Sequence, residues 1–367
     1  MFNPKIIAFH LPQYHEVEEN NRWWGQGFTE WTNVRRAKPL FHGHRQPRVP
    51  EREHYYDMTA RATREWQAQL ARSKGVYGFC YYHYWFKGQQ LLEKPVDALI
   101  EDGSPDFPFC LAWANEPWTR AWDGGEKDVL MAQSYGDQAD WDKHFAYLLH
   151  AFRDSRYIRV EGKPIFLIYR TAAIEAMPEM LARWRSLAAE AGLPGLHIVS
   201  MLTGTRADER LSLFDARAEF EPMYTLQHHL TSGHKRREKL VRHLSKLRRY
   251  FVRDARPHKL STHDYAALWK QITRRALGPH IYPGAFADWD NSPRRGLRAL
   301  VLRNFDKAAF RAGLATQLRK AREQKAPFLF FNAWNEWAEG TYLEPDTENQ
   351  SFFLDTIHQL TVQPAPP

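Results

Sequence analysis

Two glutamates near the end of the chain stand three residues apart, within the segment NAWNEWAEGT at 332–341. Cleavage of a glycosidic bond needs one carboxyl group as an acid and a second as a base or nucleophile. Neighbouring Trp side chains would desolvate one carboxyl group, which raises its pKa, while a hydroxyl or amide keeps the other ionised. The pattern favours Glu336 and Glu339 as a catalytic pair over two loop carboxylates bonded to backbone.

The chain alternates β-type runs with helical patterns, and this alternation predicts a parallel sheet. The predicted strands are Ile6–His10, Gly78–Tyr84, Phe109–Ala114, Ile165–Tyr169, His197–Met201, Ala218–Glu221, His280–Ala285 and Phe328–Trp334. The predicted helices include Thr59–Lys74, Asp140–Arg153, Ala173–Ala191, Tyr265–Ala276 and Asp306–Gln324. Eight strands fit a closed (β/α)₈ barrel of the TIM type, and the glycine fingerprints of nucleotide-binding sheets do not occur.

Active sites of such barrels form at the carboxyl ends of the strands, and polar and aromatic residues gather after the predicted strands. Ten of the 14 Trp lie there, whereas Trp66, Trp141, Trp184 and Trp269 fall in helical segments. Trp faces interleaved with carboxylates suit a sugar, whose apolar face lies on a ring while its hydroxyls bond to carboxylates and amides. The alternative is an aromatic barrel mouth without a ligand.

We expect the sugar to be held by side chains after several strands. These are His10, Tyr14, Trp24, Glu30, Trp31, Tyr84, Trp113, Asn115, Glu116, Trp118, Glu221, Tyr224, Asp288, Trp334, Asn335 and Trp337. For each of them the alternative is an ordinary hydrogen bond or packing contact at the top of the barrel. No cofactor or metal is expected at this site.

The positive charge of the chain is concentrated in one segment. The formal net charge is +8, and residues 234–259 alone hold eleven Lys or Arg and two Asp or Glu. Leu240, Leu244, Leu247 and Phe251 recur there at helical spacing, which predicts a basic amphipathic helix inserted at about 230–260. It is either a solvated insertion packed on the barrel or a peripheral contact with an anionic membrane or glycan. No motif for nucleic-acid binding accompanies it, so nucleic acid is not expected as a partner.

The composition is that of a globular protein, with 43% hydrophobic and 26% charged residues in 367. We expect one barrel domain over residues 1–360 and a loose tail over 361–367. Cys80 and Cys110 sit in apolar runs, which indicates buried thiols in a reducing compartment. The sequence lacks an apolar run long enough to span a membrane and a recognisable signal peptide. We therefore expect a cytoplasmic location, with the inner membrane face as a peripheral site.

Several long motifs, in order, resemble one family. The segment NEWAEGTYLEP at 335–345 resembles the signature of glycoside hydrolase family 99 and its WbsX-type bacterial relatives, which are often labelled glycosyltransferases of surface-polysaccharide gene clusters. The segments FHLPQYH at 9–15, NRWWGQGFTEWTNV at 21–34 and WANEPWTRAWDG at 113–124 resemble the WbsX-like branch. The similarity spans residues 5 to about 355.

This resemblance implies a (β/α)₈ barrel that cleaves α-mannoside-type linkages with retention. It implies that Glu336 acts as a base on the 2-hydroxyl of the substrate, which attacks the anomeric carbon and gives a 1,2-anhydro sugar. Glu339 would be the acid and base for the leaving group and then for water. Hydrolytic members often carry His beside the acid, where this chain has Ala338, so acid strength or sugar contacts are expected to differ.

Three functions remain open from the sequence. The first is a retaining glycosidase acting on a bacterial surface polysaccharide or its precursor. The second is a glycosyltransferase or transglycosylase of O-antigen or lipopolysaccharide biosynthesis, for which Asp288-Trp289-Asp290 could hold a metal and a sugar diphosphate. The third is a glycan-binding barrel without catalysis, which would not require the Glu336 and Glu339 pair.

Overall fold

The computed structural model describes residues 2–120, 125–230 and 260–362. Its main sheet is parallel and runs in the order β12-β10-β9-β8-β4-β2-β1-β15-β13. β12 and β13 are two parts of one run divided at Pro283, and they pair with β10 and β15 respectively. This divided strand occupies the seventh of eight positions and brings the two edges of the sheet together. The predicted (β/α)₈ barrel is therefore confirmed.

The barrel strands form from the apolar runs that the sequence shows. They are β1 (Lys5–His10), β2 (Val76–Phe86), β4 (Phe109–Trp113), β8 (Lys163–Ile168), β9 (His197–Leu202), β10 (Ala216–Glu219), β12 (Ile281–Tyr282), β13 (Gly284–Phe286) and β15 (Phe328–Asn332). Strands of a parallel sheet are covered on both faces, so they consist of nearly continuous hydrophobic residues. All five residues of β4 and all five of β15 are buried.

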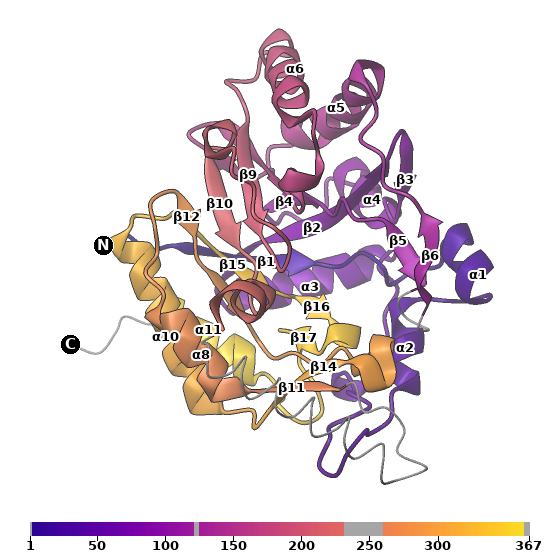
Figure 1. Ribbon diagram of the computed structural model, residues 1–367, viewed down its shortest axis with the longest axis vertical. Helices are drawn as coiled ribbons and strands as arrows, with labels where there is room; N and C mark the ends of the chain where they lie inside the picture. Colours follow the sequence, from indigo (N-terminus) through magenta and orange to yellow (C-terminus); the bar gives the residue numbers. More distant parts are fainter. Residues whose placement is uncertain (1, 121–124, 231–259, 363–367) are drawn as a thin grey trace, which may run out of the picture.

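The helices cover the outside of the barrel, with α5 and α6 on one side and α8 and α10 on another (Figure 1). They are α3 (Arg61–Ser73), α4 (Lys94–Glu101), α5 (Gln138–Arg153), α6 (Met177–Glu190), α8 (Tyr265–Arg274), α10 (Lys307–Glu323) and α11 (Phe352–Thr361). Asp137, Asp264 and Asp306 accept hydrogen bonds from the first turns of α5, α8 and α10. Such caps satisfy backbone donors that the helix itself leaves free, and they fix where each helix begins.

The predicted boundaries differ from the structure at a few elements. The helix expected from Ala173 begins at Met177, because the 3₁₀ turn η2 (Thr171–Ala173) precedes it. The strand expected over Ala218–Glu221 lies two residues earlier. After β9, the described residues hold only the 3₁₀ turn η3 (Leu211–Leu213), where other strands are followed by a helix. The four Trp predicted in helices do lie in α3, α5, α6 and α8.

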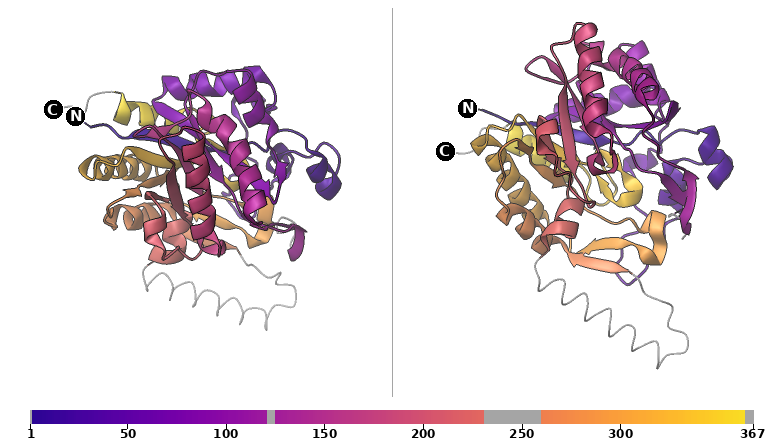
Figure 2. Two further views of the ribbon diagram at one scale, coloured as in Figure 1. Left: turned by 90° about the horizontal axis from the view of Figure 1, so that it is seen from above. Right: turned by 45° about the horizontal axis from the view of Figure 1, so that its top comes forward.

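Shorter elements extend the loops. They comprise α1 (Glu18–Trp24), α2 (Glu30–Arg36), η1 (Glu51–Glu53), β3 (Gln89–Leu91), β5 (Trp118–Arg120), β6 (Gly125–Met131), β7 (Arg159–Val160), η4 (Thr225–His229), β11 (Ser261–Asp264), α9 (Ser292–Arg295), η5 (Gly296–Arg298), β14 (Leu300–Arg303), β16 (Asn335–Glu336), η6 (Trp337–Glu339) and β17 (Thr341–Tyr342). The start of β1 and the end of α11 lie side by side (Figure 2), and Nδ2 of Asn3 donates to the carbonyl of Thr361.

Two expectations fall partly outside these residues. The basic segment 234–259 lies outside the described residues, and so does most of the tail 361–367. Within the described part of the chain, no helix combines the length and the apolar character that crossing a membrane requires.

Candidate active site

The two glutamates lie on a short loop at the carboxyl end of β15. Glu336 ends β16, Glu339 ends η6, and the antiparallel pairing of β16 with β17 turns the chain back on itself at Gly340. Gly340 has a φ of 66°, which glycine adopts without steric cost, and a Cβ atom there would lie 2.8 Å from the backbone nitrogen of Asp290. Glycine is thus required both by the turn and by the neighbouring chain. We call residues 335–342 the glutamate loop.

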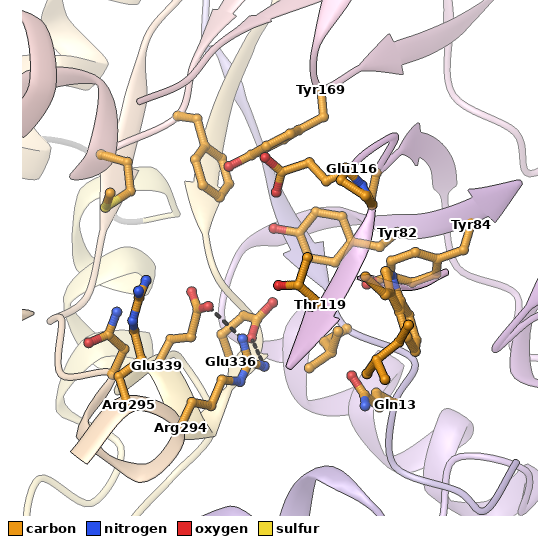
Figure 3. Close-up of a pocket in the computed structure, with 18 of the residues that line it drawn as sticks. Gln13, Tyr82, Tyr84, Glu116, Thr119, Tyr169, Arg294, Arg295, Glu336 and Glu339 are labelled. Carbon is orange, nitrogen blue, oxygen red and sulfur yellow. Dashed lines mark hydrogen bonds and ion pairs between the residues drawn. The ribbon is translucent and has the colours of Figure 1, made fainter. Parts of the chain in front are cut away.

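One guanidinium group holds both glutamates in place. Arg294, on α9 after the seventh strand, has Nη2 3.0 Å from Oε2 of Glu336 and Nη1 2.5 Å from Oε1 of Glu339. Its Nε and Nη2 donate to Oε1 of Glu30, a fully buried carboxylate on α2. Figure 3 shows the Arg294 side chain reaching toward Glu336 and Glu339. Three carboxyl groups, one from α2 and two from the glutamate loop, therefore share one cation.

The surroundings raise the proton affinity of Glu336 and of Glu30. Burial raises the pKa of Glu336 well above its usual range, and the charges of Glu339 and Glu30 add to this, while the Arg294 cation opposes it. Burial likewise raises the pKa of Glu30 against the opposing effect of Arg294. A carboxyl group with a raised pKa suits proton transfer, because it is a stronger base than an ordinary carboxylate and can also return the proton. The cluster thus has the electrostatics of an acid–base site.

The glutamates open onto a pocket at the carboxyl end of the barrel, with a volume of about 370 Å³. This size is within the range of small-molecule sites. Its walls come from seven of the eight strand positions, either from the strand itself or from the loop that follows it. The lining residues are Leu11, Gln13, Trp24, Tyr82, Tyr84, Ala114, Glu116, Pro117, Trp118, Thr119, Leu130, Tyr169, Phe220, Met223, Trp289, Asn291, Arg294, Arg295, Glu336 and Glu339.

A third carboxylate and three phenols form the wall opposite the glutamate loop (Figure 3). Glu116 pairs with Arg170 at 3.2 Å, and burial raises the pKa of this carboxyl. Burial also raises the pKa of Tyr82, Tyr84 and Tyr169 well above the usual value, so their hydroxyls stay protonated and can donate hydrogen bonds. Such a wall offers a sugar both donors and acceptors.

Six of the predicted residues line this pocket: Trp24, Tyr84, Glu116, Trp118, Glu336 and Glu339. The rings of Trp118 and Tyr84 meet edge to face at 5.3 Å, and this contact fixes the Trp118 ring at the rim. Tyr84 lies on β2, and the other five residues come from loops after β1, β4 and β15. The structure thus brings these six predicted residues together in two facing walls, and their contact with a sugar stays a prediction.

A second group of predicted residues supports the glutamate loop from behind. The side chain of Asn335 accepts from the backbone nitrogen of Leu11 at 2.8 Å and donates to the carbonyl of Leu11 at 3.0 Å. The hydroxyl of Tyr14 donates to the carbonyl of Asn335. His10 contacts Gln67 at 3.1 Å, and burial lowers the pKa of His10 to about 3. These three predicted residues join β1 to the loop and are buried away from the pocket.

The predicted Trp31, Trp113, Trp334 and Trp337 are also buried, and none is more than 5% exposed. Trp337 stacks on Tyr342 at 3.8 Å, and Trp31 packs against Trp337 at 5.6 Å. A sugar cannot reach a ring that protein atoms already cover on both faces. These four Trp are therefore placed as packing beneath the site, in contrast to the expectation that they contact sugar.

The remaining predicted residues contact arginines beside the site, and among them Asn115 hydrogen-bonds to the backbone of Arg170. Glu221 is fully buried and accepts from Arg275 at 2.6 Å, while the Arg275 guanidinium lies over the ring of Tyr224 at 4.8 Å. Asp288 pairs with Arg48 at 2.8 Å. None of these lines the pocket. Their contacts brace the ends of β4, β10 and the seventh strand, and this placement differs from the expected sugar contacts.

The carboxylate of Asp290, the second in the D-x-D motif, also contacts protein side chains. Asp290 accepts from Gln46 at 2.6 Å and contacts Nε2 of His44 at 2.8 Å. The backbone nitrogen of Asp290 donates to the carbonyl of Glu339 at 2.7 Å. Asp288 and Asp290 thus tie the segment 44–48 to the glutamate loop. Among the described residues, no group of three His, Cys, Asp or Glu is arranged to hold a metal ion.

Several lining residues were missed by the sequence reasoning. Tyr82 could have been found from strand alternation, because it lies two residues before the predicted Tyr84 on β2. Tyr169 and Trp289 follow strands, so their positions carried the same signal as the residues that were chosen. Arg294 had no such signal, because it lies in a loop and its partners are 42 to 264 residues away along the chain.

The fold has close counterparts among solved structures. A "Glycoside hydrolase-like protein" aligns with a TM-score of 0.60 at 14% identity over 98% of this chain and 94% of that one. The GH99 endo-alpha-mannosidase from Bacteroides thetaiotaomicron aligns with a TM-score of 0.58 at 12% identity over 99% and 98%. At these identities the likeness concerns the fold. The chain thus shares its (β/α)₈ barrel fold with these proteins, and it carries a carboxyl pair after its last strand.

Sequence comparison defines the family more narrowly. Residues 6–357 match the model of the family described as "Glycosyltransferase WbsX", and the chain belongs to this family. Two curated relatives from strains of Xanthomonas campestris pv. campestris, each named "Uncharacterized protein WxcX", are 38% identical over 359 residues. The match covers 96% of this chain and 49% of each relative, so the chain spans about half the length of these relatives.

Proposed function

We propose that this chain is a retaining glycoside hydrolase that acts on a bacterial surface polysaccharide or its precursor, at α-mannoside-type linkages. The observation that carries the proposal is the placement of Glu336 and Glu339 on two nitrogens of one guanidinium, at one wall of a polar and aromatic pocket. A glycosidase needs two such carboxyl groups within reach of one sugar. A protein that only binds glycans does not need them.

The proposed route uses the 2-hydroxyl of the substrate as the nucleophile. Glu336 removes the proton of this hydroxyl, whose oxygen then attacks the anomeric carbon from the face opposite the leaving group. Glu339 gives its proton to the leaving oxygen, and a 1,2-anhydro sugar forms. Glu339 then takes a proton from water, the water oxygen attacks the anomeric carbon, and Glu336 returns its proton to the 2-oxygen. Two inversions at one carbon give net retention.

The position of the two groups on one short loop supports this route. A double displacement with an enzyme nucleophile places its two carboxyl groups on opposite faces of the sugar, about 5 Å apart. Glu336 and Glu339 are instead held side by side by Arg294. With the 2-hydroxyl as the nucleophile, both carboxyl groups can approach the sugar from the same wall. The high pKa of Glu336 also strengthens it as a base toward a hydroxyl.

The second candidate function is transfer, because the family description names a glycosyltransferase. Transfer from a nucleotide sugar would need groups that hold a diphosphate, for which the sequence offered Asp288 and Asp290. Their carboxylates already contact Arg48, His44 and Gln46. This engagement supports hydrolysis over that form of transfer. Transglycosylation by the glutamate pair needs no diphosphate site and differs from hydrolysis only in the final acceptor.

The first test is analysis of products. Purified protein is incubated with repeat units of the surface polysaccharide of the organism that encodes this chain, without nucleotide sugars. Glu336→Gln, Glu339→Gln and the exposed control Glu348→Gln are treated in parallel. We expect the native chain and the control to give shortened products. Glu336→Gln and Glu339→Gln should give none.

Three other outcomes separate the alternatives. Longer products formed without nucleotide sugars indicate transglycosylation by the same pair. Extension that starts only when nucleotide sugars are added contradicts the hydrolase proposal and favours the transferase. Binding without any change in the glycan favours a non-catalytic barrel.

A further inference from the structure

A second cavity lies behind the glutamate loop, with a volume of about 550 Å³. It shares no residue with the pocket that holds Glu336 and Glu339. Its lining consists of Pro50, Glu51, Arg52, Glu53, His54, Tyr55, Tyr56, Trp66, Trp337, Glu344 and Pro345. Trp337 lies between the two glutamates in sequence, yet its side chain lines this second cavity. The glutamate loop therefore separates the pocket at Glu336 and Glu339 from this second cavity.

The mouth of the second cavity is aromatic. Tyr55 and Trp66 are half buried and His54 is exposed. The rings of His54 and Trp66 meet edge to face at 4.6 Å, and the ring of Tyr55 meets that of Trp31 at 5.1 Å. Each ring is thus held by a neighbour before anything binds, which reduces the entropy that a ligand would have to offset.

The rim of the cavity is polar and has an unusual backbone. Arg52 and Glu53 have φ values of 56° and 53°, in the left-handed region that residues other than glycine seldom adopt. Two such residues in succession cost about 1–3 kcal/mol each, and such conformations cluster at ligand sites. The backbone nitrogen of Glu51 donates to the carbonyl of Pro345 at 3.0 Å. This bond ties the rim to the segment that follows the glutamate loop.

The floor of the cavity contains a buried carboxyl group. Oε2 of Glu344 accepts from Nε1 of Trp337 at 2.7 Å and from the hydroxyl of Tyr56 at 2.8 Å. Oε1 of Glu344 accepts from Gln67 at 2.7 Å. These bonds fix the floor and connect it to the loop that carries Glu336 and Glu339. A ligand here would meet aromatic rings at the mouth and polar groups deeper in and on the rim.

We propose that this cavity is a second saccharide site, which holds an uncharged sugar unit of the same polymer whose cleaved unit lies beside Glu336 and Glu339. Aromatic rings with hydroxyl and carboxylate groups match the apolar face and the hydroxyls of a sugar. Its volume falls within the range of small-molecule sites. The rim carries Glu51 and Glu53 against Arg52, which disfavours an anionic unit. The inference rests on the proposed function only for the choice of polymer.

The test compares two tyrosines in similar settings. Tyr55 and Tyr77 are both half buried, and each lies under one cation, Arg35 at 4.2 Å and Lys5 at 4.1 Å. Tyr55 lines the second cavity, whereas Tyr77 is the second residue of β2 and lines neither of the two cavities. Tyr55→Ala and Tyr77→Ala are made in the full chain carrying Glu336→Gln and Glu339→Gln, and affinity for the surface polysaccharide is measured by retardation in native gels. His54→Ala serves as a second cavity variant at an exposed position.

We expect Tyr55→Ala to weaken the affinity for the polymer about tenfold, while Tyr77→Ala leaves it unchanged. In the chain with both glutamates, Tyr55→Ala lowers kcat/KM on the polymer and not on a single repeat unit. Equal affinity of all variants for the polymer overturns the inference, even if the chain cleaves it. Tyr55-dependent binding without cleavage supports the second site and contradicts the proposed hydrolase. If Tyr55→Ala fails to fold, His54→Ala decides in the same way.

Discussion

The ion pair between Arg294 and Glu336 spans 3.0 Å and is almost closed to solvent, with 11% and 7% of the two side chains exposed. A buried charge is costly unless it is paired, and here one guanidinium serves three carboxyl groups. The position and the proton affinity of Glu336 therefore depend on a residue from a different loop.

Arg294→Lys should lower kcat about 100-fold, because an ammonium group is a point charge and cannot bridge Glu30, Glu336 and Glu339 at once. The Arg294 cation opposes the rise in the pKa of Glu336, so a weaker contact raises that pKa further. The proposed base must be ionised, and activity is lost as the pH falls through its pKa. The acidic limb of kcat/KM against pH should therefore move to higher pH. An unmoved limb, as expected for the surface control Arg185→Lys, would contradict this role.

Glu339→Gln should abolish turnover of substrates with poor leaving groups while ligand binding survives. A leaving group such as nitrophenolate departs without a proton, so the first step on an aryl glycoside should be retained. Glu336→Gln should reduce turnover of both kinds of substrate, because the 2-hydroxyl then lacks its base. Comparing rates on natural and aryl glycosides measures this difference. Unchanged turnover by Glu339→Gln on the natural substrate would refute its assignment as the acid.

Gly340→Ala should lower both stability and turnover. Alanine at this φ costs about 1 kcal/mol, and its Cβ would also press on the backbone of Asp290 and displace the glutamate loop. Gly103 has a φ of 63° and nothing within 4 Å of a Cβ atom, so Gly103→Ala should lose stability only through the unfavourable φ. Urea unfolding of the two variants measures how much stability each one loses. Their kcat values show whether the contact with Asp290 also affects turnover. Equal kcat values would show that the contact with Asp290 does not position the glutamates.

Glu344→Gln should change how stability depends on pH. Burial raises the pKa of Glu344 from 4.5 to about 7, so the folded chain retains a proton that the unfolded chain has lost. The stability linked to this proton is complete below about pH 4.5 and is lost as the pH rises through 7, by about 3 kcal/mol in all. The free energy of unfolding of the native chain, minus that of Glu344→Gln, should fall over this range. For the exposed control Glu348→Gln, the same difference in the free energy of unfolding should not fall over this pH range.

Neutralising Lys and Arg within 235–249 should weaken binding to anionic vesicles without changing cleavage of a soluble glycan. This part of the chain holds eight Lys or Arg and one Glu, and attraction to anionic lipid is about 1 kcal/mol per basic residue near the surface. Vesicle sedimentation at low and high salt measures the effect, which salt should screen. A native chain that shows no vesicle affinity at low salt would end the idea of peripheral membrane contact.

The barrel could be predicted from the sequence because its evidence is local. Each buried parallel strand, such as Phe109–Trp113, is itself an apolar run, and each strand end carries the polar residues that follow it. The divided seventh strand escaped prediction, because Pro283 interrupts pairing inside a run that still reads as one strand. The predicted starts of some helices differ from the observed ones. At these helices a capping residue or a 3₁₀ turn sets the boundary, and the periodicity of hydrophobic residues does not reveal it.

The site was predicted in part for a related reason. Glu336, Glu339, Glu116 and Trp118 follow strands, and the fold alone brings such positions together. Trp31 and Trp337 follow the same rule, but a sequence does not reveal whether a ring faces a pocket or packs beneath it. The role of Arg294 depends on closure of the whole barrel, because it joins residues 30, 336 and 339.

The glutamate pair occupies one loop, whereas the aromatic and hydroxyl-bearing walls come from loops after other strands. A single local deletion within residues 335–342 would remove both carboxyl groups and leave most of the walls in place. Under the proposed function, such a deletion would remove catalysis in one evolutionary step and keep the walls that bind the glycan. Conversely, a barrel that already held the walls could gain the chemistry through one inserted segment, provided that an arginine stood opposite to receive it.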